Sequence, residues 1–184
     1  SQTMSATGLA TFGNLSVASV GSKVLTASGT GLTSGVSNSF SITVGLPGTI
    51  VASGGTPQSA QVNTTYATNL QATVKDTAGN PVSGVLVTFA RPASGAGGTF
   101  AGADTVRTNG SGVATSPVLS ANTVAGPFTI SASVSGVATP ATFFLTNNPG
   151  TLRRISATDG TPQSTTISTA FPVLFKATVT DTFN

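Results

Sequence analysis

The sequence contains no cysteine, no histidine, no tryptophan and no glutamate. Without cysteine there are no disulfides and no thiolate metal sites. Without histidine, cysteine and glutamate, the usual nucleophile–base and carboxylate-pair arrangements reduce to serine, lysine and four aspartates. We therefore expect a protein that is not an enzyme, with no catalytic residues and no cofactor.

Charge is scarce as well, at 6% of the residues, and the net charge of +3 reflects a shortage of acids. The seven basic side chains are scattered, and only Arg153 and Arg154 are adjacent. A nucleic-acid-binding surface needs clustered basic residues with stacking aromatics, which this chain lacks. No apolar run approaches the ~18 residues of a membrane helix. We expect no nucleic acid, no membrane span and no small-molecule substrate.

The residues that are abundant favour strands and turns. Serine, threonine, glycine and alanine dominate, with ten prolines, a mixture that disfavours long helices. In residues 70–89 the apolar side chains alternate, with Leu70, Ala72 and Val74 before a turn at 76–81 and Val85, Val87 and Phe89 after it. This pattern predicts a hairpin of two half-buried strands in an all-β fold.

The chain repeats itself. A shift of 105 residues places residues 50–79 on 155–184 without a gap and with 13 identities, including GTPQS at 55–59 and 160–164. The start of the chain follows the same shift, since residues 21–28 resemble 126–133. Such a period indicates tandem units. We expect the C-terminal half of one unit at 1–45, a complete unit at 46–147 and the N-terminal half of a third at 148–184.

The strands expected in the complete unit are short and regularly spaced, at residues 49–62, 66–76, 82–90, 105–108, 113–119, 128–135 and 141–145. Residues 95–102 are expected to form a loose loop. About seven short strands in ~100 residues predict an immunoglobulin-like sandwich. In the N-terminal unit, Leu25 and Ala27 are expected on one strand and Phe40, Ile42 and Val44 on the last.

Three motifs give the chain a family resemblance. Residues 76–89 (DTAGNPVSGVLVTF), 108–115 (TNGSGVAT) and 140–146 (PATFFLT) resemble the bacterial Ig-like repeats of the invasin and intimin type, and residues 8–15 with 37–43 look like a sibling repeat. The resemblance implies an extracellular tandem array that acts as a stalk, adhesin or fibre component. It implies no catalytic residues.

The aspartates are interpreted as structural. Asp76 and Asp181 occupy the same turn position in successive units, where the carboxylate caps backbone donors. Asp104 completes the set of four aspartates, which are the only side-chain carboxylates that a catalytic mechanism could use. Asp159, near a junction, could contribute to an inter-domain calcium ion, but one carboxylate does not make a site. We therefore predict no metal site.

Lys23 has two interpretations, because strand parity places it on the same face as Leu25 and Ala27. It either forms an intramolecular isopeptide crosslink with an asparagine or lies at the mouth of the sandwich with its ammonium in water. Tyr66 is expected at a core position. Phe144 is expected to face outward.

The two end units are expected to be incomplete, because half a sandwich exposes an apolar face and strand edges. Neighbouring copies or adjacent repeats of the same protein are expected to complete them. Two explanations remain open: the chain is an excerpt of a longer polypeptide, or it is a subunit completed by its neighbours in a filament. The short junctions at 46–48 and 147–150 carry proline, which predicts units placed end to end with limited bending.

The function expected from these observations is a structural Ig-like module of a bacterial extracellular filament, fibre or adhesin stalk, assembled linearly. The alternative is an adhesin module that recognises a glycan or a cell-surface receptor through its loops. A glycan platform would normally present tryptophan or several tyrosines, and this chain has only Tyr66.

Overall fold

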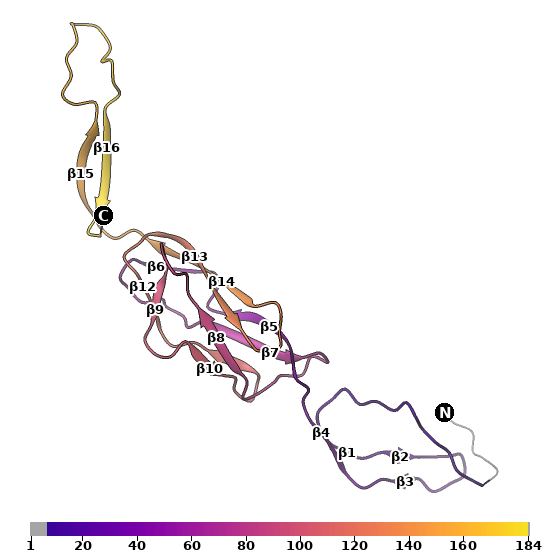
Figure 1. Cartoon of the computed structure of the whole chain (residues 1–184). Helices are drawn as coiled ribbons and strands as arrows, with labels where there is room; N and C mark the ends of the chain where they lie inside the picture. Colours follow the sequence, from indigo (N-terminus) through magenta and orange to yellow (C-terminus); the bar gives the residue numbers. More distant parts are fainter. Residues whose placement is uncertain (1–6, 184) are drawn as a thin grey trace.

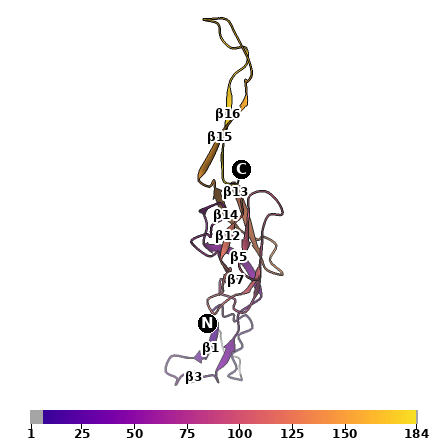
Figure 2. The same cartoon turned by 90° about the vertical axis from the view of Figure 1, so that its left-hand side faces the viewer.

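The computed structural model describes residues 7–183, and these residues form strands and turns without a helix. The predicted all-β class is therefore confirmed. The strands follow one another along an elongated molecule, with β1–β4 at one end, a sandwich of β5–β14 in the middle and the pair β15–β16 at the other end (Figure 1). Figure 2 shows the same order after a quarter turn. No helix in the described part of the chain is long and apolar enough to cross a membrane.

The central sandwich consists of two sheets and a small pair of strands. One sheet has the order β11 (Val113–Thr115), β7 (Gln71–Asp76), β5 (Pro47–Gly54). The other has the order β10 (Thr105–Arg107), β8 (Leu86–Ala90), β13 (Gly126–Ser133), β14 (Ala141–Asn148), β6 (Gln58–Gln61), with β6 parallel to β14. The strands β9 (Gly98–Phe100) and β12 (Leu119–Ala121) pair with each other.

A single apolar core lies between the sheets, and alternation along the strands supplies it. The predicted inward faces of β7, β13 and β14 are confirmed, and their apolar side chains are buried. Phe89 lies at the centre, with its ring 6.0 Å from that of Phe100 and 5.9 Å from that of Phe143. Each such side chain contributes about 1.5–3 kcal/mol by leaving water.

The predicted hairpin at 70–89 is wrong in its pairing, although the turn and the buried faces are correct. β7 pairs with β5 and β11, whereas β8 pairs with β10 and β13 in the opposite sheet. Both edges of β7 are occupied, so β8 has no edge to join. The chain closes a small turn, with the Val82 amide bound to the Val74 carbonyl at 3.0 Å, and then crosses to the second sheet.

Three other expected segments differ in detail. The strand expected at 49–62 divides into β5 and β6, which lie in different sheets. The strand expected at 113–119 divides into β11 and β12 on either side of Ser116, whose hydroxyl accepts a hydrogen bond from the Leu70 amide. The expected loop at 95–102 contains the paired strand β9, because its backbone meets β12.

The segments that flank the sandwich form smaller pairs of strands. Before it, β1 (Gly21–Lys23) pairs with β4 (Phe40–Ile42), and β2 (Thr26–Ala27) with β3 (Gly35–Val36). After it, β15 (Leu152–Asp159) pairs with β16 (Lys176–Asp181). The division into units at 1–45, 46–147 and 148–184 stays a prediction, and its residues 1–6 and 184 lie outside the described part of the chain.

Candidate functional site at the repeat junctions

The four aspartates lie apart from one another. Asp76 and Asp181 end β7 and β16, Asp159 ends β15, and Asp104 is exposed before β10. Within residues 7–183, no three acidic side chains come together as a metal site would require. The carboxylates therefore have to be understood one by one, and two of them share a role at the junctions.

Asp76 caps its own turn and also binds the linker that enters the sandwich. Its Oδ1 atom accepts hydrogen bonds from the amides of Ala78 (3.0 Å) and Asn80 (2.8 Å). Its Oδ2 atom accepts one from the amide of Gly45, at 3.1 Å. The Asn80 side-chain amide and these backbone amides hold the pKa of Asp76 below its usual range. The cap was expected from the sequence, whereas the bond to Gly45 was not.

Asp181 repeats this arrangement at the second junction. Its Oδ2 atom accepts a hydrogen bond from the Gly150 amide at 2.6 Å, and its Oδ1 atom accepts one from the Phe183 amide at 2.7 Å. Gly150 lies 105 residues after Gly45, as Asp181 does after Asp76. We call the bond from the glycine amide to the aspartate Oδ2 atom the junction contact.

Asn80 extends the first junction toward the preceding segment. Its Nδ2 atom donates to Asp76 Oδ2 at 3.1 Å and to the backbone carbonyl of Ala18 at 3.1 Å. Ala18 precedes β1, so this bond links the central sandwich directly to the strands before it. One turn thus holds both the linker and a loop of the segment from which the linker comes.

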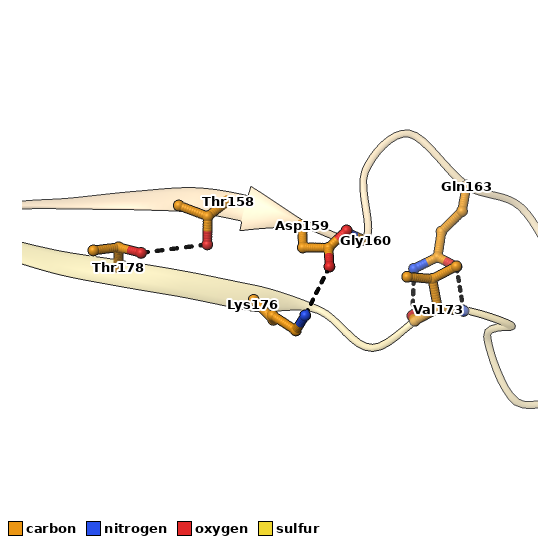
Figure 3. Close-up of polar contacts among 7 residues, drawn as sticks. All are labelled: Thr158, Asp159, Gly160, Gln163, Val173, Lys176 and Thr178. Atoms are coloured by element: carbon orange, nitrogen blue, oxygen red, sulfur yellow. Dashed lines mark hydrogen bonds and ion pairs between the residues drawn. The ribbon is translucent and has the colours of Figure 1, made fainter.

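A second feature recurs with the same period. The Gln58 side chain binds both backbone groups of Thr68, donating to its carbonyl at 2.7 Å and accepting from its amide at 3.2 Å. Gln163 binds Val173 in the same way, at 2.8 and 3.1 Å (Figure 3). We call this pair of bonds the glutamine bridge. It lies within a run that is identical in the two repeats.

Asp159 forms an ion pair and lies away from the junction. Its Oδ2 atom is 2.9 Å from Lys176 Nζ, and its Oδ1 atom accepts from the Gly160 amide at 2.8 Å (Figure 3). The ammonium of Lys176 is the main cause that lowers the pKa of Asp159. Both side chains are largely exposed, so the pair contributes little stability. Asp159 lies at the end of β15 that is farther from Gly150. Asp159 is therefore not at the junction where an inter-domain calcium ion would bind.

The outer strand pair β15–β16 leaves uncovered the positions that the sandwich buries. At these positions, each 105 residues apart, the relative exposure rises from 5% to 71% between Ile50 and Ile155, from 0% to 58% between Leu70 and Phe175, and from 0% to 51% between Val74 and Val179. In the sandwich they face the second sheet. In β15–β16 the described residues offer no such sheet.

The segment before the sandwich has an apolar hollow of its own, lined in part by Phe12, Leu15, Leu25 and Val36. Leu25 corresponds to the buried Ile130 of the sandwich. Lys23 is half-buried on β1 opposite Phe40. The two interpretations of Lys23, an isopeptide crosslink or an ammonium in water, both stay open.

The predicted placements of both aromatic residues are confirmed, and one of them has a partner that sequence reasoning missed. Phe144 is exposed beside a shallow hollow that Pro57 and Pro127 help to line. Tyr66 is buried, and its hydroxyl donates to Asn147 Oδ1 at 2.6 Å. Burial raises the pKa of Tyr66 to about 12. The alternation along β14 could have identified Asn147, because it places this polar residue at an inward position, where it needs a hydrogen-bonding partner.

Comparison with known proteins gives one family and several similar structures. Residues 54–146 match the family model described as bacterial Ig-like domain (group 1). No curated protein matches the chain.

Three of the similar solved structures have low identity. The D00-D0 domain of intimin is 22% identical, with 60% of this chain and 57% of that chain covered and a TM-score of 0.41. FdeC, an Escherichia coli adhesin, is 14% identical, with 79% and 45% covered and a TM-score of 0.46. Domains 4-9 of the surface layer protein SbsC are 16% identical, with 98% and 30% covered and a TM-score of 0.44. The chain spans less than two thirds of each of these solved chains.

Proposed function

Because the chain belongs to the family of bacterial Ig-like domains (group 1), we propose that it is a structural repeat module of a bacterial extracellular filament, fibre or adhesin stalk. Its units follow one another in a line and carry no catalytic step. Its job is to provide length and to transmit force between neighbouring units. The extracellular location follows from the resemblance to invasin- and intimin-type repeats.

The observation that carries this proposal is the recurrence of whole hydrogen-bonded arrangements every 105 residues. The glutamine bridge of Gln58 returns at Gln163, and the junction contact of Asp76 returns at Asp181. A polymer of such units adds stability unit by unit and extends without limit on its length. In this proposal each repeat has the same role, which is to extend the array.

The partners in this proposal are adjacent repeats or neighbouring copies of the same protein. The apolar positions of β15–β16 are exposed, while the sandwich buries the corresponding positions of β5 and β7 against its second sheet. A partner that supplies the strands of such a second sheet would cover about the same apolar surface. Exposed apolar faces of this kind mark interaction sites.

Immunoelectron microscopy of the native material tests the proposal. An antibody against the central sandwich is expected to label filaments or surface projections outside the cell, at regular intervals along their length. Labelling confined to the cytoplasm, or to the tips of the projections alone, contradicts a stalk module.

The alternative function is ligand recognition, and the exposed ring of Phe144 beside its shallow hollow is the feature that favours it. A glycan array separates the two functions. A stalk module is expected to bind no glycan, and the Phe144→Ala variant is expected to behave like the parent chain. Binding that disappears in Phe144→Ala would favour the alternative.

A further inference from the structure

We propose that the turn at residues 76–80 is the surface through which each repeat binds the end of the repeat before it. Asp76 and Asp181 hold the linker through the junction contact, and Asn80 holds the preceding segment at Ala18. This goes beyond a role as a stalk, because a flexible string of sandwiches would also provide length. The junction contact fixes the direction in which the linker leaves the preceding repeat.

The two oxygens of the carboxylate divide the work. Oδ1 of Asp76 accepts the backbone amides of its own turn, and Oδ2 accepts the amide of Gly45 together with the Asn80 side chain. The Asp76 side chain is only 6% exposed. A residue that capped only its own turn would not bind the linker, whereas Oδ2 accepts the Gly45 amide in addition to the Asn80 side chain. Hydrogen bonds to a charged acceptor are among the stronger ones in proteins.

The contact persists where the linker sequence changes. Residues 46–48 read Leu-Pro-Gly at the first junction, and residues 151–153 read Thr-Leu-Arg at the second. Even so, Gly150 donates to Asp181 as Gly45 donates to Asp76. The contact therefore recurs with the aspartate and the glycine amide, although the residues that follow the glycine differ.

The register of the first strand supports the same assignment. Pro47 pairs with Asp76 and Leu152 pairs with Asp181, and in both cases the register shifts just beyond this pair. The shift lets the linker bend toward the aspartate. Each junction is thus held at two successive points, by strand pairing and by the carboxylate.

The variant Asp76→Asn tests the contact, and it also removes the Oδ2 acceptor of the Asn80 Nδ2 atom. The asparagine oxygen still caps the amides of Ala78 and Asn80, but its NH2 group has no acceptor to offer the Gly45 amide. Asp104→Asn is the matched control, because it makes the same chemical change at an exposed aspartate. We expect the Gly45 amide to exchange about tenfold faster in Asp76→Asn and unchanged in Asp104→Asn.

Distance measurements test the consequence for the whole junction. The chain lacks cysteine, so Ser41→Cys and Thr142→Cys, both at exposed positions, carry two unique spin labels. The distance distribution is expected to be narrow in the parent chain and in Asp104→Asn, and to lose its narrow peak in Asp76→Asn. An unchanged distribution together with unchanged exchange at Gly45 overturns the proposal.

The second junction keeps the proposal testable if Asp76→Asn fails to fold. Asp181→Asn lies outside the sandwich and leaves its core untouched. The Gly150 amide is expected to lose its protection in this variant, while the unfolding midpoint of the sandwich stays the same. A Gly150 amide that is as protected as in the parent chain overturns the proposal.

Discussion

The hydroxyl of Tyr66 donates a 2.6 Å hydrogen bond to Oδ1 of Asn147, and both side chains are buried. The Nδ2 atom of Asn147 in turn donates to the Gly97 carbonyl, the Val124 carbonyl and the Asn122 side chain. One side chain on β14 therefore joins the loops before β9 and β13 to the core. Buried polar groups that are fully satisfied in this way specify one packing arrangement.

Replacing Asn147 by leucine is expected to destabilise the sandwich by about 2–4 kcal/mol, because the Tyr66 hydroxyl and the two carbonyls lose their buried partner. Asn148→Leu is the matched control on the same strand, and its side chain is exposed. The control is expected to stay within about 0.5 kcal/mol of the parent chain. Chemical denaturation of the three proteins measures the difference. Equal stabilities would show that the Asn147 bonds are dispensable.

Stability is expected to fall between pH 10 and pH 12. The pKa of Tyr66 is raised to about 12 in the folded protein, so the unfolded state loses its phenolic proton first as the pH rises. The folded state then binds more protons, and the free energy of unfolding decreases, by at most about 3 kcal/mol. Tyr66→Phe should lack this component. Since Tyr66 is the only tyrosine and there is no tryptophan, phenolate absorbance follows its titration directly.

Acid is expected to weaken the first junction. Hydrogen bonds lower the pKa of Asp76 in the folded state, so its contribution is complete above the ordinary aspartate pKa of ~3.9. It is lost as the pH falls through the lowered value. Unfolding free energies of the parent chain and Asp76→Asn are expected to differ at pH 7 and to converge at acidic pH. A difference that is constant with pH would mean that the Asp76 charge plays no part.

Alanine substitutions at two adjacent phenylalanines on β14 are expected to change stability by very different amounts. Phe143 is completely buried against Phe89, whereas Phe144 is 61% exposed. Phe143→Ala is expected to cost about 3–5 kcal/mol because it leaves a cavity. Phe144→Ala is expected to change stability by about 0.5 kcal/mol or less. Thermal unfolding of both variants checks the assignment, and a large loss in Phe144→Ala would reverse the predicted faces of β14.

The strand faces and the repeat could be predicted from the sequence because they depend on local periodicity. Alternation predicts the buried positions of β7, β13 and β14. The identical GTPQS runs predict a repeat, and they contain the glutamines of the two glutamine bridges. The identity of the sheet that a strand joins was not predictable in this way. β8 alternates as a hairpin arm would, but β5 and β11 already occupy both edges of β7.

The junction contact could not be predicted from local sequence patterns either. The Asp-Thr-Ala-Gly-Asn pattern is local, and it indicates that Asp76 is a turn residue. Its bond to Gly45 joins residues 31 positions apart, and nothing in the residues 43–48 marks a particular amide as the donor. The 105-residue period is the signal that could have found it, since Gly45 and Gly150 occupy equivalent positions, as Asp76 and Asp181 do.

The central claim is that residues 148–183 begin another unit equal to the central one. It can be tested by joining residues 79–147 of the central unit after residue 183, which supplies the strands that β15–β16 would need. The reaction rate of a thiol reagent with the single cysteine of Val179→Cys measures whether that position becomes covered. The rate is expected to be high in the parent chain and to fall in the fusion to that of Val74→Cys. A rate that is the same with and without the added residues would contradict the claim.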